Sequence, residues 1–281
     1  MTEKAASDHW PRHARQWALV GPPLRPCAED TAVVEAAVAA WAGATGHPPR
    51  ALVLGVTPEL VGMRWPAGSA VTAIDRSAAM IAAMRRADLS AAATALQADW
   101  RALPCSAASV DVAVGDGSLS CLAFPGDYHR FAGELARVLV PDGELVLRLF
   151  ASPVARETLD EVAAALAARG IASFHAFKWR LAMAIAGGGD VAVADIARAF
   201  DRVVPDAAAR AELAVHTGWP LAVIATIDAY RGSDLVYSFP TRADAVAALA
   251  PHFTVRAWHA PTYELGERCP TIVLGRAASE P

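Results

Sequence analysis

Glycine and acidic residues follow several short apolar runs of the sequence, at positions where strands would end. Gly55, Asp75, Asp99 and Asp116 each stand directly after such a run. Because the carboxyl ends of parallel strands meet at one edge of a sheet, we expect these residues to lie close together. A glycine lets a ligand approach the backbone, and a carboxylate accepts hydrogen bonds from hydroxyl and amino groups. The pattern therefore predicts a ligand site at this edge.

The turn after the first predicted strand contains a single glycine. Gly55 is followed by Val56, Thr57 and Pro58, in which threonine suits a helix N-cap and proline the first helical position. We therefore expect free backbone N–H groups at a helix start beside the ligand. A dinucleotide site requires Gly-x-Gly-x-x-Gly for its pyrophosphate, whereas a nucleoside without phosphate requires less. Asp75, at the end of the next strand, suits ribose hydroxyls.

The segment from Arg137 to Phe150 contains the most specific motif of the chain. Arg137-Val138-Leu139-Val140-Pro141-Asp142-Gly143 leads into an apolar strand. It resembles the Arg-x-Leu-x-Pro-Gly-Gly turn of the class I S-adenosylmethionine-dependent methyltransferases, with Asp142 where glycine is usual. Aspartate tolerates the left-handed turn conformation, so the departure is mild. Together with Gly-Val-Thr-Pro-Glu as a variant of motif I, the resemblance covers roughly 30–150 in the order expected of that family.

The resemblance implies S-adenosylmethionine as the cofactor and gives several residues a role. Asp75 would bind the ribose, Asp99 would accept from the adenine amino group, and Trp100 would stack on the ring. Met80 would touch the adenine edge or pack in the core. The implied cofactor-binding residues are Gly55, Val56, Thr57, Asp75, Arg76, Met80, Asp99, Trp100, Gly115, Asp116 and Gly117.

Asp116 is also the candidate catalytic base, because it would end the fourth strand beside the methyl group. The alternative is that it orients the cofactor amino group or holds a turn. Tyr128 and His129, one turn later, are further candidates, although residues at a helix start are more often bystanders.

The alternation of strands and helices predicts an α/β fold: a doubly wound, mostly parallel, seven-stranded Rossmann-like methyltransferase sheet with a helical insert after strand five. Strands six and seven are expected at Phe253–His259 and Thr271–Arg276. We expect an N-terminal arm or lid, the cofactor-binding core, a helical cap, and the final helix and strands, at residues 1–30, 31–170, 171–238 and 239–281. Helices after strand five are expected at 156–168, 173–186, 191–203, 206–215 and 219–230.

Aromatic residues of the insert and the arm predict an enclosed pocket. The arm has Trp10, His13 and Trp17 at helical spacing, which would cover a sulfonium by cation–π attraction or pack on the surface. The insert would cap the site and enclose a small organic acceptor, or else pack on the far side as a homodimer interface. Lys178 and Arg180 would suit an acidic acceptor, but charges on a helix usually face solvent.

Composition limits the functional classes. The chain has 281 residues, 54% of them hydrophobic, and a net charge of −4, which argues against nucleic-acid binding through bulk phosphate neutralisation. The amino-group methylases of nucleic acid in that family usually carry an Asn-Pro-Pro-Tyr segment after strand four. This chain lacks it, which argues against that substrate class. The four cysteines form no Cys-x-x-Cys pair and the histidines show no metal spacing. With no secretory signal and no membrane-spanning apolar run, we expect a cytoplasmic protein.

These observations leave three functions open. The first is a methyltransferase that acts on a small molecule by direct methyl transfer. The second is a catalytically silent S-adenosylmethionine-binding protein that regulates a partner. The third is a nicotinamide oxidoreductase on a similar sheet, although the pyrophosphate glycines are missing.

Overall fold

The first strand, β1 (Arg50–Leu54), lies inside the sheet because its side chains are apolar on both faces. The computed structural model describes residues 9–86 and 93–277. In β1, Ala51 and Val53 join the core on one face of the sheet, and Leu52 and Leu54 join the core on the other. The remaining strands of this sheet are β2 (Ala70–Asp75), β3 (Thr94–Gln97), β4 (Val110–Asp116), β5 (Leu139–Arg148), β8 (Phe253–His259) and β9 (Thr271–Arg276).

The strand order confirms the predicted topology. Within the described residues, seven strands pair in the order β3-β2-β1-β4-β5-β9-β8, and β9 runs antiparallel to both of its neighbours. The chain winds outward from β1 to β3 and then returns to place β4 on the other side of β1. Ligands of such sheets bind beyond the carboxyl ends of the strands at this reversal. The fold therefore places the ends of β1 and β4 side by side.

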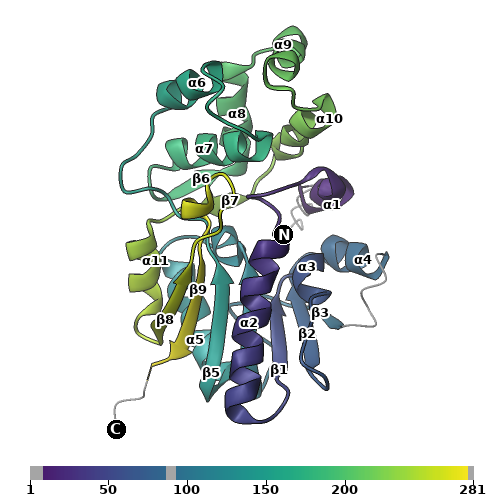
Figure 1. Ribbon diagram of the computed structural model, residues 1–281, viewed down its shortest axis with the longest axis vertical. Helices are drawn as coiled ribbons and strands as arrows, with labels where there is room; N and C mark the ends of the chain where they lie inside the picture. The colour runs from purple at the N-terminus through teal and green to yellow at the C-terminus, as the bar shows by residue number, and fades with distance from the viewer. Residues whose placement is uncertain (1–8, 87–92, 278–281) are drawn as a thin grey trace, which may run out of the picture.

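Helices cover both faces of the sheet (Figure 1). One core contains side chains from α2 (Ala28–Thr45), α3 (Pro58–Val61) and α4 (Ala78–Arg86). The opposite core contains side chains from α5 (Gly126–Val138) and α11 (Arg242–Leu249). Helix α2 begins at Ala28, two residues before Asp30. Asp30 lies inside the first turn, and its carboxylate accepts from the backbone N–H of Cys27 at 2.9 Å.

The predicted helical insert follows β5 and forms a separate layer above the sheet (Figure 1). Its helices enclose a core of their own that includes Phe174, Phe177 and Phe200. The stretch predicted as a helix at 191–203 begins instead with a short strand, which pairs antiparallel with a later one. The stretch at 219–230 is divided into an α-helix and a 3-10 helix. The elements are α6 (Leu159–Ala167), α7 (Phe174–Ala186), β6 (Asp190–Ala192), α8 (Val193–Val203), α9 (Ala207–Thr217), α10 (Leu221–Ile224), η4 (Ala225–Tyr230) and β7 (Val236–Ser238).

One helix assigned to the core belongs to the upper layer. We expected 156–168 to be the usual helix that packs on the sheet after strand five. Val162 and Leu166 of α6 instead join the core of the insert, and α6 packs beside α7. The apolar spacing of α6 is the same in either position, so it does not indicate the partner. The other predicted domain boundaries stay predictions.

The N-terminal arm lies between the sheet and the insert. Helix α1 (His9–Gln16) and the 3-10 turn η1 (Trp17–Leu19) lie beside the upper layer (Figure 1). The imidazole of His9 shares a hydrogen bond of 3.1 Å with the phenol of Tyr237, and the ring of His175 bonds to the carbonyl oxygen of Leu19 at 2.9 Å. Residues 1–8 of the predicted arm lie outside the described part. The described arm therefore binds to the insert through buried polar contacts.

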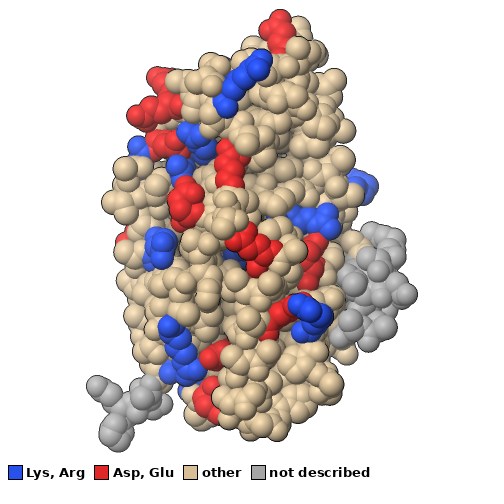
Figure 2. Space-filling view, in the orientation of Figure 1, with Lys and Arg blue, Asp and Glu red and all other residues tan. Residues whose placement is uncertain are grey.

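Charged side chains on the face shown in Figure 2 are scattered, and positive and negative ones alternate over it. The described Lys and Arg side chains on this face do not gather into a continuous basic surface. Among the helices of residues 9–86 and 93–277, none combines the length and the apolar composition needed to cross a bilayer.

Gly117 directly follows β4 and gives the most direct test of this arrangement. Its φ of 60° lies in the left-handed region, and a Cβ atom added here would overlap the ring of Phe150. We expect Gly117→Ala to lower the free energy of unfolding by about 1–3 kcal/mol, since both the backbone and the packing oppose the methyl group.

The control is Gly43→Ala in α2, where nothing lies within 4 Å of an added Cβ. This variant should raise the free energy of unfolding by up to about 1 kcal/mol, because alanine restricts the unfolded chain. Urea denaturation measures both effects. Equal stability of the two variants would contradict the packing described.

Candidate functional site

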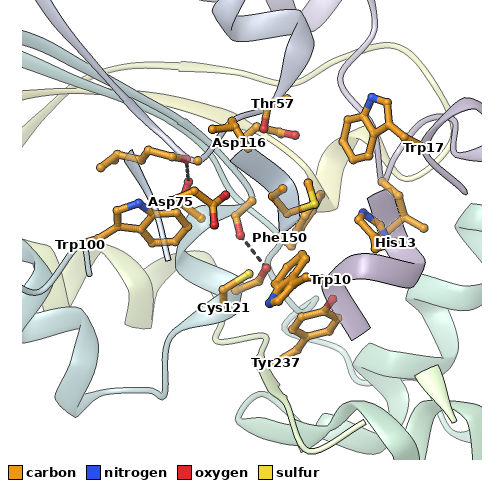
Figure 3. A pocket seen from close by; sticks show the side chains of 18 of the residues that line it. Trp10, His13, Trp17, Thr57, Asp75, Trp100, Asp116, Cys121, Phe150 and Tyr237 are labelled. Atoms are coloured by element: carbon orange, nitrogen blue, oxygen red, sulfur yellow. Dashed lines mark hydrogen bonds between the residues drawn. The ribbon is translucent and has the colours of Figure 1, made fainter. Parts of the chain in front are cut away.

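Two adjoining cavities lie where the carboxyl ends of β1, β2 and β4 face the arm and the insert (Figure 3). The inner cavity has a volume of about 100 Å³ and the outer cavity about 610 Å³. Trp10, Asp75, Trp100 and Cys121 line both. Of the predicted cofactor-binding residues, the inner cavity is lined by Gly55, Val56, Thr57, Asp75, Met80, Trp100, Asp116 and Gly117. The outer cavity adds Arg76 and Asp99.

The turn after β1 brings the backbone to the inner cavity. Gly55 has a φ of 109°, which only glycine adopts without strain, and its N–H donates to the carbonyl oxygen of Ile74 at 2.8 Å. A Cβ atom added here would lie 3.8 Å from Trp100 and 3.9 Å from the carboxylate of Asp75. The helix that begins at Pro58 is only four residues long. Gly55 therefore leaves the loop after β1 accessible to a ligand, whereas the predicted helix at Pro58 forms only a single helical turn.

Asp75 lies between the two cavities. Its carboxylate accepts from the backbone N–H of Ser77 at 2.7 Å, and the backbone of Val56 also donates to it. Burial raises the pKa of Asp75, and these donors oppose the rise. A partly buried carboxylate held by backbone donors is suited to bind hydroxyl groups in both cavities. Arg76 and Met80 follow it at the start of α4 and line the outer and inner cavity, respectively.

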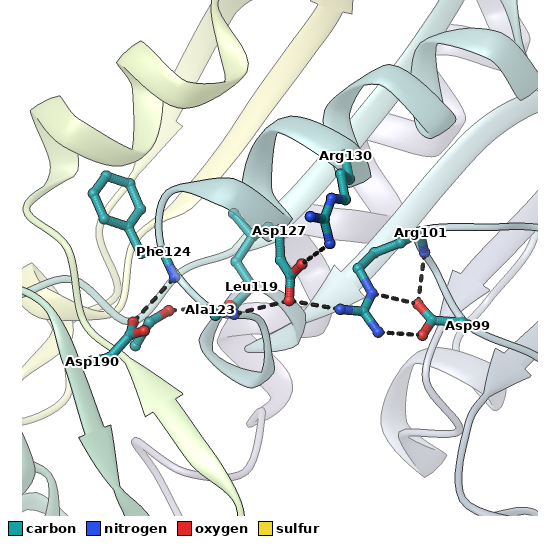
Figure 4. A network of polar contacts seen from close by, with 9 residues as sticks. Asp99, Arg101, Leu119, Ala123, Phe124, Asp127, Arg130 and Asp190 are labelled. Carbon is teal, nitrogen blue, oxygen red and sulfur yellow. Dashed lines mark hydrogen bonds and ion pairs between the residues drawn. The ribbon is translucent and has the colours of Figure 1, made fainter.

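Trp100 and Asp99 form the far wall of the outer cavity. The indole Nε1 of Trp100 donates to the carbonyl oxygen of Ile74 at 2.6 Å, which fixes the ring against the turn after β1. Asp99 accepts two hydrogen bonds from the guanidinium of Arg101, at 2.6 and 2.9 Å. These hydrogen bonds lower the pKa of Asp99 to about 2, so the group is a permanent anion. Arg101 also pairs with Asp127 on α5 (Figure 4).

Asp116, the candidate base, is held by a buried arginine. The Nε atom of Arg148 donates to its carboxylate at 2.5 Å, and both side chains are almost fully buried. Burial raises the pKa of Asp116, whereas the charge of Arg148 lowers it. Arg148 also donates to the carbonyl oxygen of Pro23 and to the phenol of Tyr263. A carboxylate paired in this way is a well-fixed hydrogen-bond acceptor.

Gly115 has a different position from the one predicted. It lines neither cavity, and an added Cβ would lie 2.6 Å from the hydroxyl oxygen of Ser118 and 3.0 Å from Leu147. The glycine therefore serves close packing under the turn. Tyr128 and His129 also lie elsewhere: Tyr128 is buried and bonds to Ser238, and His129 is exposed. Neither of them lines a described cavity.

The arm and the insert close the inner cavity from above. Trp10, His13 and Trp17 come from the arm, and Trp179, Tyr230 and Tyr237 come from the insert. Figure 3 shows Trp10, His13 and Tyr237 on the side opposite Asp75 and Thr57. The phenols of Tyr230 and Tyr237 are hydrogen-bonded to each other. The sequence predicted that aromatic residues of the insert and the arm enclose a pocket, but not which rings of the insert line it, because helical spacing separates a buried face from a cavity wall poorly.

Several lining residues were not predicted at all. Phe150, Ser118, Ser120 and Cys121 face the inner cavity from the segments that follow β5 and β4. Burial raises the pKa of Cys121 to about 12, so it remains a thiol. Their place in the sequence could have identified them as lining residues, because each follows a strand end at the same edge of the sheet as Asp116.

Lys178 contradicts the expectation of a solvated charge. Its side chain is 1% exposed, and its ammonium lies 4.6 Å from the centre of the Tyr230 ring. Burial lowers the pKa of Lys178 to about 7. Burial, and then the charge of Lys178, also lower the pKa of His9 and of His175 to about 4. Burial lowers the pKa of His13 to about 3, with smaller contributions from His9 and Lys178. These three imidazoles are therefore neutral near pH 7.

The described residues include no group of His, Cys, Asp and Glu side chains that could hold a metal ion.

Comparison with known families gives one match. Residues 55–147, which contain the turn after β1 and the segment through β5, match the family described as a methyltransferase domain. No curated protein is similar enough in sequence to be counted as a relative.

Solved structures with the same fold cover almost the whole chain. The CcbJ methyltransferase from Streptomyces caelestis is 13% identical, with a TM-score of 0.56, over 97% of this chain and 99% of its own. The 1,6-didemethyltoxoflavin-N1-methyltransferase from Burkholderia thailandensis, with bound 1,6-didemethyltoxoflavin and S-adenosylhomocysteine, is 15% identical, with a TM-score of 0.50, over 99% and 93%. A protein from Rhodobacter sphaeroides described as a Zn-dependent alcohol dehydrogenase is 14% identical, with a TM-score of 0.56, over 95% and 98%. At these identities the likeness concerns the fold.

Burial of Lys178 should make the free energy of unfolding depend on pH. Between about pH 7 and pH 10, the unfolded chain holds a proton on Lys178 that the folded protein has released. Unfolding therefore takes up a proton, and the contribution of this group to stability increases as the pH rises. We expect wild type to gain up to about 3 kcal/mol of unfolding free energy relative to Lys178→Met between about pH 7 and pH 9.5.

Urea unfolding over a pH series measures this difference. Arg180→Met, on the same helix, is the matched control because Glu157 pairs with Arg180 at 2.5 Å. It should show no such pH dependence relative to wild type. Parallel curves for wild type and Lys178→Met would mean that the lysine is not buried as described.

Proposed function

We propose that this chain, which carries a class I S-adenosylmethionine-dependent methyltransferase domain and uses that cofactor, transfers the methyl group directly to a small organic acceptor. The enclosure of the inner cavity is the observation that carries the proposal. Its walls combine strand ends of the sheet with aromatic side chains from the arm and from the insert. A macromolecular acceptor requires an open edge at this point, whereas an enclosed and largely apolar cavity fits a small molecule.

We place the cofactor across the two cavities with its adenine in the outer one. The outer cavity, at about 610 Å³, has room for the adenine, which would lie against Trp100 with its amino group toward Asp99. The ribose would lie at Asp75, which lines both cavities. The sulfonium and its methyl group would then lie in the inner cavity, near Gly55 and Asp116. The aromatic rings of Trp10 and Trp17 support this orientation, because cations are attracted to aromatic faces.

The methyl transfer is a direct displacement that needs few catalytic groups from the protein. A lone pair of the acceptor atom forms a bond to the methyl carbon while the bond from sulfur to that carbon breaks, and the sulfonium becomes a neutral thioether. A proton on the acceptor atom leaves to water or to a base. Positioning of the reactants supplies much of the rate. The ion pair with Arg148 fixes the carboxylate of Asp116, so we assign Asp116 to the amino group of the cofactor rather than to proton removal.

In this arrangement the insert is a cap and the arm is a lid. The inner cavity of about 100 Å³ is small for a cofactor end together with an acceptor, so we infer that the lid opens to admit the acceptor. Opening would exchange polar contacts that hold the arm in the closed position. They include the pair between Arg25 and Glu59 at 2.5 Å and the bond between His9 and Tyr237.

The other functions receive less support. The methyltransferase match does not favour a catalytically silent protein, although it does not test turnover. A nicotinamide cofactor would need pyrophosphate contacts at the turn after β1, where Val56 and Thr57 follow the single glycine. The fold shared with the Rhodobacter protein does not supply them.

The first test concerns Asp75. Asp75→Ala should weaken the binding of S-adenosylhomocysteine by about 1–3 kcal/mol, because hydrogen bonds to a charged group are lost. Isothermal titration calorimetry measures the affinity. Asp160→Ala, an exposed aspartate on α6, should bind like wild type. Unchanged affinity in a folded Asp75→Ala protein would remove Asp75 from the cofactor site, and failure of wild type to bind would remove the methyltransferase proposal.

The second test concerns the lid. Backbone amides of residues 9–19 should exchange more slowly with deuterium once S-adenosylhomocysteine is bound, because the ligand contacts Trp10 and Trp17 and holds α1 closed. Helix α9, which lines neither cavity, provides the internal control and should exchange at the same rate. Identical exchange of α1 with and without the ligand would show that the arm is a fixed wall.

A further inference from the structure

Lys178 is a buried amine without a counter-ion, and it carries a positive charge where the pH lies below its pKa of about 7. No carboxylate among the described residues pairs with it, and its known contacts are the rings of Tyr230 at 4.6 Å and Phe174 at 5.8 Å. Aromatic rings attract an ammonium, but they do not replace a counter-charge in a desolvated site. The neighbouring imidazoles of His9, His13 and His175 cannot neutralise it either. The insert thus keeps a positive charge where an apolar side chain would cost less.

This charge lies directly behind the wall of the inner cavity. Tyr230 contacts Lys178 and also lines the cavity, and so does its hydrogen-bonded neighbour Tyr237. Trp179, next to Lys178 in α7, lines the cavity as well, and its buried indole N–H has no hydrogen-bond partner among the described residues. None of the side chains that the arm and the insert contribute to the cavity is a carboxylate. This half of the wall therefore offers hydrogen-bond donors and a nearby positive charge.

The opposite half carries the negative charge. Asp75 and Asp116 line the cavity from the strand ends, where the cofactor would lie. A sulfonium beside these carboxylates would be compensated, whereas an ammonium behind Tyr230 has no carboxylate partner, so the positive potential lies on the insert's side of the space. In a cavity of low polarity, such a space favours an anion.

We propose that the acceptor is an anion, such as a carboxylate, phenolate or enolate on a small planar molecule, and that Lys178 is the positioning residue that selects it. The inference rests on the proposed methyltransferase function. Attack of an anion on a sulfonium removes both charges, because the new bond to carbon neutralises the nucleophile as the sulfur becomes a thioether. No proton has to be removed in that step, which agrees with the absence of a free carboxylate base in this half of the cavity. An apolar wall favours such a step, because the transition state carries less charge than the separate anion and sulfonium.

The test uses probes that share a shape and differ in charge: benzoate, benzamide and benzamidinium. Binding is measured by ligand-observed NMR at about pH 6, where Lys178 is protonated. The wild-type protein is saturated with S-adenosylhomocysteine, which prevents turnover. We expect benzoate to bind about tenfold more tightly than benzamide, and benzamidinium more weakly than either. Lys178→Met should abolish the preference for benzoate, and Lys178→Arg should retain it.

Arg180→Met controls for the net charge of the protein, because it removes a positive charge of α7 that Glu157 already neutralises. It should bind the probes like wild type. Benzamide binding as tightly as benzoate, no binding of benzoate, or an equal loss of preference in Lys178→Met and Arg180→Met would each overturn the proposal. Binding of S-adenosylhomocysteine is measured separately. If it persists while the preference is missing, only the inference about charge fails, and the methyltransferase function stands.

Discussion

The buried guanidinium of Arg148 joins the parts of the molecule that surround the inner cavity. It lies at the end of β5 with its side chain 2% exposed, and it bonds to Asp116, to the carbonyl oxygen of Pro23 and to the phenol of Tyr263. Burial alone would lower the pKa of Arg148, but the neighbouring carboxylate and phenol raise it, so the charge is permanent. A desolvated charge is tolerated only while its partners stay in place. Strand β4, the arm and the loop before β9 are therefore held together.

This arrangement gives the proposed lid a fixed base. The arm is attached at Pro23 by Arg148 and at Asp30 by the phenol of Tyr263, which donates at 3.0 Å. Beyond these points, α1 contacts the insert through a small number of side-chain bonds. Opening of α1 would then expose the inner cavity without disturbing Asp116. The separation of a fixed hinge from a movable helix is what an enclosed active site needs to exchange its ligands.

The sequence predicted the sheet better than the layer above it. Each strand of the core carries apolar residues bounded by turn signals, and the order of Gly55, Asp75, Asp99 and Asp116 indicated which ends meet. The insert gave weaker signals because its alanine-rich helices have similar apolar spacing on several faces. Helix α6 was assigned to the wrong layer for this reason, and the strand β6 (Asp190–Ala192) is too short for its pattern to be distinguished. Likewise, nothing in the neighbourhood of Lys178 in the sequence shows that its side chain is buried.

The two buried cations of the site differ in a way that bears on its chemistry. Arg148, in the core, has a carboxylate in contact, so its charge is cancelled locally and serves structure. Lys178, in the insert, has aromatic rings in contact, so its charge acts on whatever occupies the cavity. The pair of layers thus sets up an electrical asymmetry across a narrow space: carboxylates at the strand ends, and an uncompensated cation behind the opposite wall. In the proposed complex, such a field would hold a cationic methyl donor on one side and draw an electron-rich acceptor to the other. The insert, in this account, contributes to the orientation of the two reactants as well as to the enclosure.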